Sequence, residues 1–232
     1  MHPFGQTRSA RHHDHILQTP DTFVRAPLPG MRGAMAVVHA SPALGAKFTQ
    51  YTAEFEAGGT LAPAVDQRFI YVLEGAMESL GAGEYAWFPP GSSVELRAVT
   101  TARVVAIEKP YGPLRGSTLP GFFSGCENQV APVPLLGNAA VEVRSLIPDD
   151  AAFDLAVNTM TFQPGATLPM VEMHVMEHGL LMLEGAGIYR LGDHWYPVSA
   201  GDFIWMAPWL PQWFGALGKV PAKYLIYKDW NR

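Results

Sequence analysis

The chain has 232 residues, of which 48% are hydrophobic and 16% are charged, which indicates a folded globule and excludes a disordered or fibrous protein. A net charge of -5 at pH 7 argues against a nucleic-acid partner, and the lack of an apolar run of about 20 residues argues against a membrane span. The N-terminus lacks the apolar leader of a secreted protein and the single cysteine, Cys126, excludes an internal disulfide, so we expect a cytoplasmic protein.

Short strands separated by turns are expected along the whole chain, which predicts an all-β fold. The 23 glycines and 20 prolines interrupt short runs rich in Val, Ile, Phe, Tyr and Trp, and long helical periodicity is hard to find. Apolar runs at 69–73 and 223–227 have the composition of buried strands. In chain order we expect an N-terminal arm, a first barrel, a Gly- and Pro-rich linker and a second barrel, at 1–45, 46–109, 110–134 and 135–232.

The division into two barrels follows from an internal repeat. Residues 69–75 match residues 179–185, and both segments end in Leu-Glu-Gly. Residues 83–91 match residues 201–209, because each is a Gly-acid turn followed by a short apolar strand that stops at proline. Two β-barrels or sandwiches in tandem explain this repeat best.

The segment 170–178 contains the strongest chemical signal. If it is an extended strand, Glu172, His174 and His178 project from one face, whereas Glu177 has the opposite parity. One carboxylate and two imidazoles on one side suit a divalent metal that prefers oxygen and nitrogen ligands. The alternative is a polar strand face whose histidines only form hydrogen bonds. The apolar residues around the segment favour the metal site, because buried polar groups without partners are costly.

These signatures resemble the cupin superfamily, whose small β-barrels hold a metal between two short motifs. The first motif places histidines and a carboxylate before a glycine, and the second runs from Gly-Asp through an apolar strand and a proline to a final histidine. By this resemblance the ligands are Glu172, His174, His178 and Gln212. The set is rearranged, because glutamate replaces the usual first histidine, His178 the usual carboxylate, and glutamine the last histidine.

The first barrel lacks these ligand types. When Gly75 is aligned with Gly185, the three residues opposite the first three ligands are Ala62, Ala64 and Arg68. When Gly83 is aligned with Gly201, Val94 stands opposite Gln212. None of them is an ordinary metal ligand. We therefore expect the first barrel to be structural and without metal.

The ligand order resembles one bicupin family, the (S)-ureidoglycine aminohydrolases of allantoin and purine degradation. The similarity covers nearly the whole chain and is densest at 171–179, 185–198 and 224–232. It implies two tandem cupin barrels of the double-stranded β-helix (jelly-roll) type with an N-terminal arm. It also implies a Mn²⁺ site that hydrolyses (S)-ureidoglycine to (S)-ureidoglycolate and ammonia, although Fe²⁺, Co²⁺ or Ni²⁺ also fit the ligands.

The same resemblance implies that Tyr189, Tyr224 and Lys228 contact the substrate and take part in catalysis. Lys228 can neutralise the substrate carboxylate, and tyrosine hydroxyls can bond the ureido group or orient the amine. Taken alone, the two tyrosines are more often strand residues and Lys228 a solvated charge. The general base stays open between a metal-bound water and a tyrosine.

Two other functions fit a cupin of this kind. One is a dioxygenase or isomerase that acts on another small carboxylic acid, and the other is a non-catalytic cupin that binds a ligand beside a structural metal. Four protein ligands leave open positions on an octahedral ion, which favours catalysis. Apart from the small-molecule substrate, the only partner we expect is the chain itself, as a homo-oligomer.

A second histidine cluster stands in the N-terminal arm. His12, His13 and His15 could form another metal site, but they precede any strand signal and we favour a solvated or packing segment. His194 has the sequence context of a hairpin turn. Cys126 has no histidine nearby in the sequence, so we do not expect it to be a nucleophile.

Overall fold

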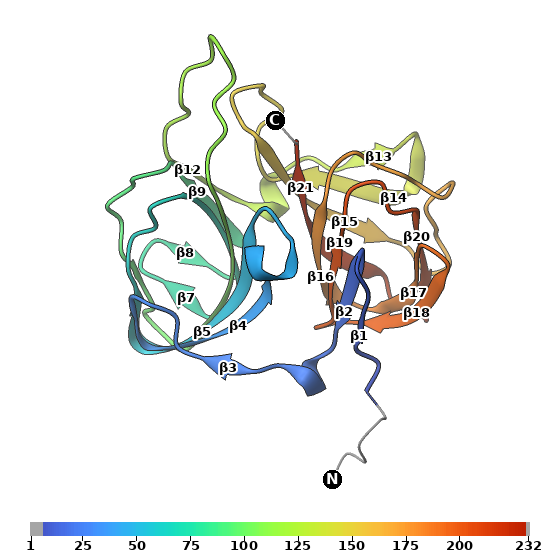
Figure 1. Ribbon diagram of the computed structural model, residues 1–232, viewed down its shortest axis with the longest axis horizontal. Helices are drawn as coiled ribbons and strands as arrows, with labels where there is room; N and C mark the ends of the chain where they lie inside the picture. Colours follow the sequence, from blue (N-terminus) through green and yellow to red (C-terminus); the bar gives the residue numbers. More distant parts are fainter. Residues whose placement is uncertain (1–6, 231–232) are drawn as a thin grey trace. The chain divides into compact units, whose positions relative to one another are not determined.

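The computed structural model describes residues 7–230, and within this range the chain consists of β-strands, three short 3-10 turns and loops. The predicted all-β fold class is confirmed. Two compact units are present (Figure 1). The N-terminal unit comprises Val24–Val130 and Leu146–Asp154, and the C-terminal unit comprises the described residues up to Phe23, Ala131–Ser145 and the described residues from Leu155 onward. No helix in the described range is long and apolar enough to cross a membrane.

The N-terminal unit has one large sheet in the order β12-β9-β6-β11-β5-β4-β3, with β10 paired to β5, and a small β7-β8 hairpin. Its interior is apolar, with Ile70, Val72 and Val104 almost completely buried. The strands are β3 (Arg25–Ala26), β4 (Met31–Ala40), β5 (Thr49–Leu61), β6 (Gln67–Glu74), β7 (Ala76–Met77), β8 (Leu80–Gly81), β9 (Glu84–Phe88), β10 (Leu96–Arg97), β11 (Ala102–Lys109) and β12 (Phe123–Cys126), with 3-10 turns at Pro42–Leu44 and Glu127–Gln129.

The C-terminal unit has a sheet in the order β1-β2-β19-β16-β21-β15-β14-β13 and a smaller sheet in the order β18-β17-β20. Phe162, Tyr189 and Phe214 are among the buried side chains of its core. The strands are β1 (Ala10–Arg11), β2 (His15–Gln18), β13 (Val133–Leu135), β14 (Asn138–Ser145), β15 (Leu155–Phe162), β16 (His178–Glu184), β17 (Ala186–Leu191), β18 (His194–Ser199), β19 (Phe203–Met206), β20 (Gln212–Leu217) and β21 (Ala222–Asp229), with a 3-10 turn at Pro20–Thr22.

The sequence repeat corresponds to a repeated strand arrangement. The order β9-β6-β11-β5-β4 in one unit matches the order β19-β16-β21-β15-β14 in the other. The Leu-Glu-Gly segments end β6 and β16, and their glycines, Gly75 and Gly185, have left-handed φ values of 75° and 69°. A Cβ added to Gly75 would lie 2.1 Å from the Thr101 carbonyl oxygen, and one added to Gly185 would lie 2.4 Å from the Pro221 carbonyl oxygen. Both turns therefore require glycine.

The structure divides the chain at other positions than those expected from the sequence. Within the expected arm, β2 pairs with β19 of the C-terminal unit, whereas β3 and β4 belong to the N-terminal sheet. The expected linker contains β12, which pairs with β9, and β13, which pairs with β14. The assignment of the arm depends on a partner far away in the chain, because β2 occupies the place beside β19 that β12 occupies beside β9.

Candidate metal centre

The segment that leads to the candidate site is not the continuous strand that its alternating pattern predicted. Between β15 and β16 only two isolated bridges form, Thr167 with Gly215 and Glu172 with Gln212. The segment advances five residues between these bridges while β20 advances three, so two extra residues bulge and a regular ladder cannot continue. Of the predicted strand at 170–178, only His178 belongs to a strand, where it begins β16.

The four predicted ligands nevertheless lie together. The backbones of Glu172 and Gln212 exchange two hydrogen bonds of 2.8 Å. Glu172 Oε2 lies 3.1 Å from His174 Nε2, and the imidazole rings of His174 and His178 are 5.4 Å apart between centroids. The Glu177 carboxylate instead accepts a hydrogen bond from the Trp205 indole at 3.0 Å. The Glu172 and His174 side chains are thus in contact, the His178 ring lies beside that of His174, and the Gln212 backbone is paired with that of Glu172.

The surroundings of the His178 side chain decide whether it can bind a metal. Its side chain is buried, its Nδ1 lies 3.3 Å from the Tyr227 carbonyl oxygen, and its Nε2 has no hydrogen-bond partner among the described residues. A carbonyl only accepts, so Nδ1 carries the proton and Nε2 presents a lone pair. Burial lowers the pKa of His178 to about 3, helped by the positive charge of Lys228 and by His174. A neutral imidazole with an unsatisfied buried nitrogen is what a metal ligand requires, and this donor set fits a divalent ion.

Tyr189 lies behind one of the predicted ligands. Its completely buried hydroxyl donates a hydrogen bond of 2.7 Å to Gln212 Oε1. The two side chains come from neighbouring strands, β17 and β20, whose register pairs Leu191 with Gln212. A carbonyl oxygen has a second lone pair, so this bond orients the amide and leaves a position for a metal. Tyr189 is therefore placed to hold Gln212.

Tyr224 and Lys228 lie on β21, which pairs with β16. Lys228 is the direct cross-strand partner of His178, and Tyr224 is the partner of Met182. The Tyr224 hydroxyl lies 3.4 Å from the Met160 sulfur inside the core. Burial raises the pKa of the Tyr224 hydroxyl and of Tyr189, and it lowers the pKa of Lys228 against the attraction of Glu172. Both tyrosines are therefore neutral hydrogen-bond donors at physiological pH.

A strained residue fixes His174. Trp209 has a positive φ of 67°, and its N–H donates a hydrogen bond of 2.6 Å to the His174 carbonyl oxygen. The matching residue in the N-terminal unit, Gly91, has a φ of 74°, which glycine adopts without cost. A tryptophan in this conformation costs about 1 kcal/mol or more. The C-terminal unit thus accepts strain in the turn that contacts the ligand loop.

The N-terminal unit fills the corresponding place with an ion pair. Arg68 and Glu108 correspond to His178 and Lys228, and they are also direct cross-strand partners. Arg68 Nε lies 2.7 Å from Glu108 Oε1, which also accepts a bond of 2.6 Å from the Tyr51 hydroxyl. The Arg68 guanidinium therefore places a protein cation at the position where the C-terminal unit has His178.

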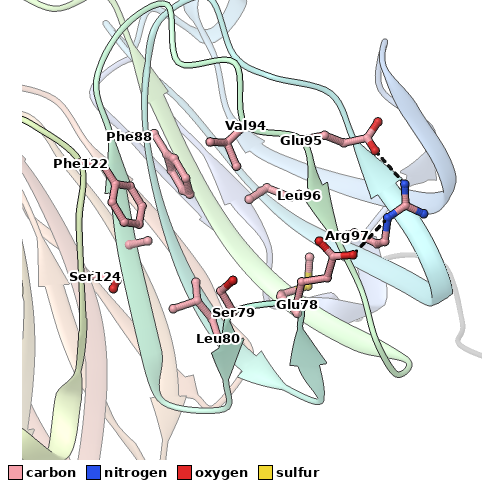
Figure 2. A pocket seen from close by; sticks show the side chains of 12 residues that line it. Glu78, Ser79, Leu80, Phe88, Val94, Glu95, Leu96, Arg97, Phe122 and Ser124 are labelled. Carbon is pink, nitrogen blue, oxygen red and sulfur yellow. Dashed lines mark hydrogen bonds and ion pairs between the residues drawn. The ribbon is translucent and has the colours of Figure 1, made fainter.

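A cavity of about 270 Å³ in the N-terminal unit offers no comparable ligand set (Figure 2). Figure 2 shows Phe88 and Phe122 on one side and Glu78, Glu95 and Arg97 on another. Arg97 lies 3.0 Å from one carboxylate and 3.4 Å from the other, so both acids are already paired. The cavity is otherwise mainly apolar, with lining residues that also include Met77, Leu80, Ala86, Val94 and Leu96.

One contact of the cupin motif could not be anticipated from the sequence. Asp202, the acid of the Gly-Asp turn, is completely buried, and its Oδ1 lies 2.9 Å from Arg8 Nη2. The Asp202 carboxylate also accepts a hydrogen bond of 2.8 Å from the Ser199 backbone. An arginine in the first residues of the chain has no local pattern that would indicate this partner. The contact depends on the pairing of β2 with β19.

The fold and this site define a cupin with two tandem units. Residues 158–227 match the cupin domain family. The chain is 41% identical to (S)-ureidoglycine aminohydrolase of Arabidopsis thaliana, and the match covers 98% of this chain and 80% of that protein. It is 39% identical to the probable (S)-ureidoglycine aminohydrolase of Oryza sativa, where the match covers 98% of this chain and 77% of that protein. The crystal structure of a putative glyoxylate induced protein from Pseudomonas aeruginosa is 31% identical, with a TM-score of 0.90 over 100% of this chain and 94% of that one. The chain belongs to the (S)-ureidoglycine aminohydrolase family.

Proposed function

We propose that the protein hydrolyses (S)-ureidoglycine to (S)-ureidoglycolate and ammonia in allantoin degradation, at a Mn²⁺ site in the C-terminal unit. The observation that carries this proposal is the unsatisfied, buried Nε2 of His178, whose ring lies beside that of His174, which in turn contacts Glu172, the backbone partner of Gln212. Family membership supplies the substrate. A mixed oxygen and nitrogen shell without thiolate suits Mn²⁺.

In this mechanism the substrate gains a hydroxyl group from water at one carbon and loses its amine as ammonia. The bound ion would supply Lewis-acid chemistry and a template for the reacting groups. Lys228 neutralises the substrate carboxylate, and the neutral Tyr224 hydroxyl donates a hydrogen bond to a polar substrate atom. Tyr189 orients the Gln212 amide from behind. Because these groups approach from fixed strands, water reaches one face of the carbon and one enantiomer forms.

The decisive experiment generates ureidoglycine from allantoate in a coupled assay and follows ammonia release and the chirality of ureidoglycolate. Ureidoglycine decays without an enzyme, so the signal is the rate above background together with a single enantiomer. We expect (S)-ureidoglycolate from the Mn²⁺-loaded protein. Racemic product at the background rate would overturn the proposal, and oxygen uptake would indicate a cupin dioxygenase instead.

The ligand assignment has a separate test in Mn²⁺ content. Glu172→Ala removes a carboxylate of the proposed shell and should abolish Mn²⁺ retention. Glu177→Gln changes a nearby carboxylate that contacts Trp205 and should leave Mn²⁺ bound. Elemental analysis after dialysis measures both, with circular dichroism to check the fold. Equal Mn²⁺ loss in the two variants would contradict the assignment.

We also propose that the protein is a homo-oligomer. Met170, Val171, Met173 and Val175, on the ligand-bearing loop, are all at least 40% exposed, and Trp209 is 61% exposed. A row of exposed apolar side chains is typical of a surface that another subunit covers. Light scattering after size-exclusion chromatography measures the mass, and a monomer of 25.3 kDa would contradict the proposal.

A further inference from the structure

Three histidines that are far apart in the sequence lie together in the C-terminal unit. His12 and His15 belong to the N-terminal β1-β2 segment, and His194 begins β18. One ring nitrogen of each lies within 4.8 Å of those of the other two. The ring centroids are 4.5 Å apart for His12 and His15, 4.2 Å for His12 and His194, and 5.4 Å for His15 and His194.

His15 is the fixed member of this cluster. It is buried, with Nδ1 2.8 Å from Asp14 Oδ1 and Nε2 2.8 Å from the Tyr196 hydroxyl. The carboxylate can only accept, so it holds the proton on Nδ1 and leaves Nε2 as a lone-pair donor. A carboxylate on the distal nitrogen is the arrangement that orients histidine ligands in metal sites. Asp14 therefore prepares Nε2 of His15 to bind a cation in place of the Tyr196 hydrogen bond.

The other two histidines can complete the shell. The rings of His12 and His15 are within 17° of parallel, so one ion cannot lie in both ring planes until the His12 ring turns. His12 and His194 reach the surface, where side-chain rotation is not hindered by core packing. Three imidazoles with one position open to water form a tetrahedral shell typical of Zn²⁺. Imidazole ligands without oxygen also favour Zn²⁺ over Mn²⁺.

We propose that His12, His15 and His194 form a second metal site, separate from the candidate metal centre, that binds Zn²⁺ or a similar transition-metal ion. Such an ion would join the N-terminal β1-β2 segment to the hairpin of β17 and β18. The strand registers pair His15 with Met206 and Met206 with His178. With strands about 4.8 Å apart, the backbones of His15 and His178 are about 10 Å apart, two strands from each other in the same sheet.

The test measures Zn²⁺ stoichiometry after removal of all metal with a chelator, by calorimetric titration and by elemental analysis after dialysis. His174→Ala is used as the background, because it disrupts the proposed catalytic shell and leaves the second cluster intact. We expect this variant to bind one equivalent of Zn²⁺, and His174→Ala with His194→Ala to bind none. His174→Ala with His13→Ala is the matched control, because His13 is adjacent, 93% exposed and outside the cluster, and it should still bind one equivalent.

Two further measurements distinguish a site oriented by Asp14 from unspecific binding of Zn²⁺ to surface histidines. Asp14→Asn should weaken Zn²⁺ binding by roughly 10- to 100-fold, because the distal partner of His15 loses its charge. Zn²⁺ should raise the melting temperature of His174→Ala but not that of the variant that also lacks His194. The proposal is overturned if His174→Ala binds no Zn²⁺, or if His13→Ala lowers the binding as much as His194→Ala does. Neither result depends on ureidoglycine hydrolysis.

Discussion

His178 and Lys228 are direct cross-strand partners on β16 and β21, so the candidate metal ligand and the cation beside it share one row of the sheet. The same row of the N-terminal unit holds Arg68 and Glu108, paired at 2.7 Å. This cross-strand position thus holds an imidazole and an ammonium group in the C-terminal unit, whereas it holds an ion pair in the N-terminal unit. The ammonium group of Lys228 lacks a carboxylate partner on this row, which suits it to bind an anionic substrate.

Lys228→Ala should therefore raise KM by about 10- to 100-fold, the loss of a hydrogen bond to a charged group. The Mn²⁺ content should stay unchanged, because Lys228 is a cation and cannot donate a lone pair to the metal. Steady-state kinetics and elemental analysis on the same preparation measure both quantities. Loss of the metal in this variant would show that ligands and substrate contacts have been divided wrongly.

Tyr189→Phe should act through the metal and not through the substrate. The variant removes the hydroxyl that donates to Gln212 Oε1 while the ring keeps its place in the core. We expect Mn²⁺ affinity to fall by about 10-fold, with KM for the substrate little changed at saturating Mn²⁺. Tyr224→Phe is the matched control, because its hydroxyl contacts the Met160 sulfur at 3.4 Å, whereas that of Tyr189 donates directly to a proposed ligand. Equal Mn²⁺ affinities in the two variants would refute the positioning role of Tyr189.

Much of the fold could be predicted because short motifs of the internal repeat mark equivalent turns and strands in the two units. The Leu-Glu-Gly turns and the Gly-acid strands fall on equivalent strands of the two units, and glycine is required at Gly75 and Gly185 by close backbone contacts. The boundaries could not be predicted, because β2 pairs with β19 across almost the entire chain. The pattern of a four-residue strand does not indicate so distant a partner.

The site was predicted in part for a similar reason. The spacing of Glu172, His174 and His178 indicated a common face, but the real geometry depends on a bulged loop fixed by the Glu172–Gln212 bridge. Gln212 was named only through family resemblance, and its bond to Tyr189 follows from strand register. A single sequence does not reveal contacts such as these, because they depend on how two strands are aligned with each other.

The Arg68–Glu108 pair predicts a stability effect confined to the N-terminal unit. Glu108→Gln leaves the buried Arg68 guanidinium without its counter-charge and should lower the free energy of unfolding by about 3 kcal/mol. Arg68→Met combined with Glu108→Leu should cost less, because no uncompensated charge remains. Urea denaturation of the three proteins measures the difference, and Mn²⁺ content should be the same in all. A double variant less stable than Glu108→Gln would contradict this account.

His39 predicts acid sensitivity in the N-terminal unit. Its buried imidazole bonds the Thr52 hydroxyl at 2.8 Å, and burial lowers the pKa of His39 to about 3. In the unfolded chain its pKa is about 6.5, so between these values the unfolded state binds a proton that the folded state does not. This contribution to stability is therefore complete above pH 6.5 and is lost as pH falls toward 3, by up to about 1.4 kcal/mol per pH unit.

His39→Gln keeps a polar side chain that can bond Thr52 and removes the titration. Urea denaturation at several pH values between 7 and 4 should give a shallower loss of stability for the variant than for the natural protein, by up to one proton in slope. His178 titrates in both proteins, so its contribution cancels in the difference. Identical slopes for the two proteins would mean that His39 is protonated in the folded state and that its burial is relieved by local opening.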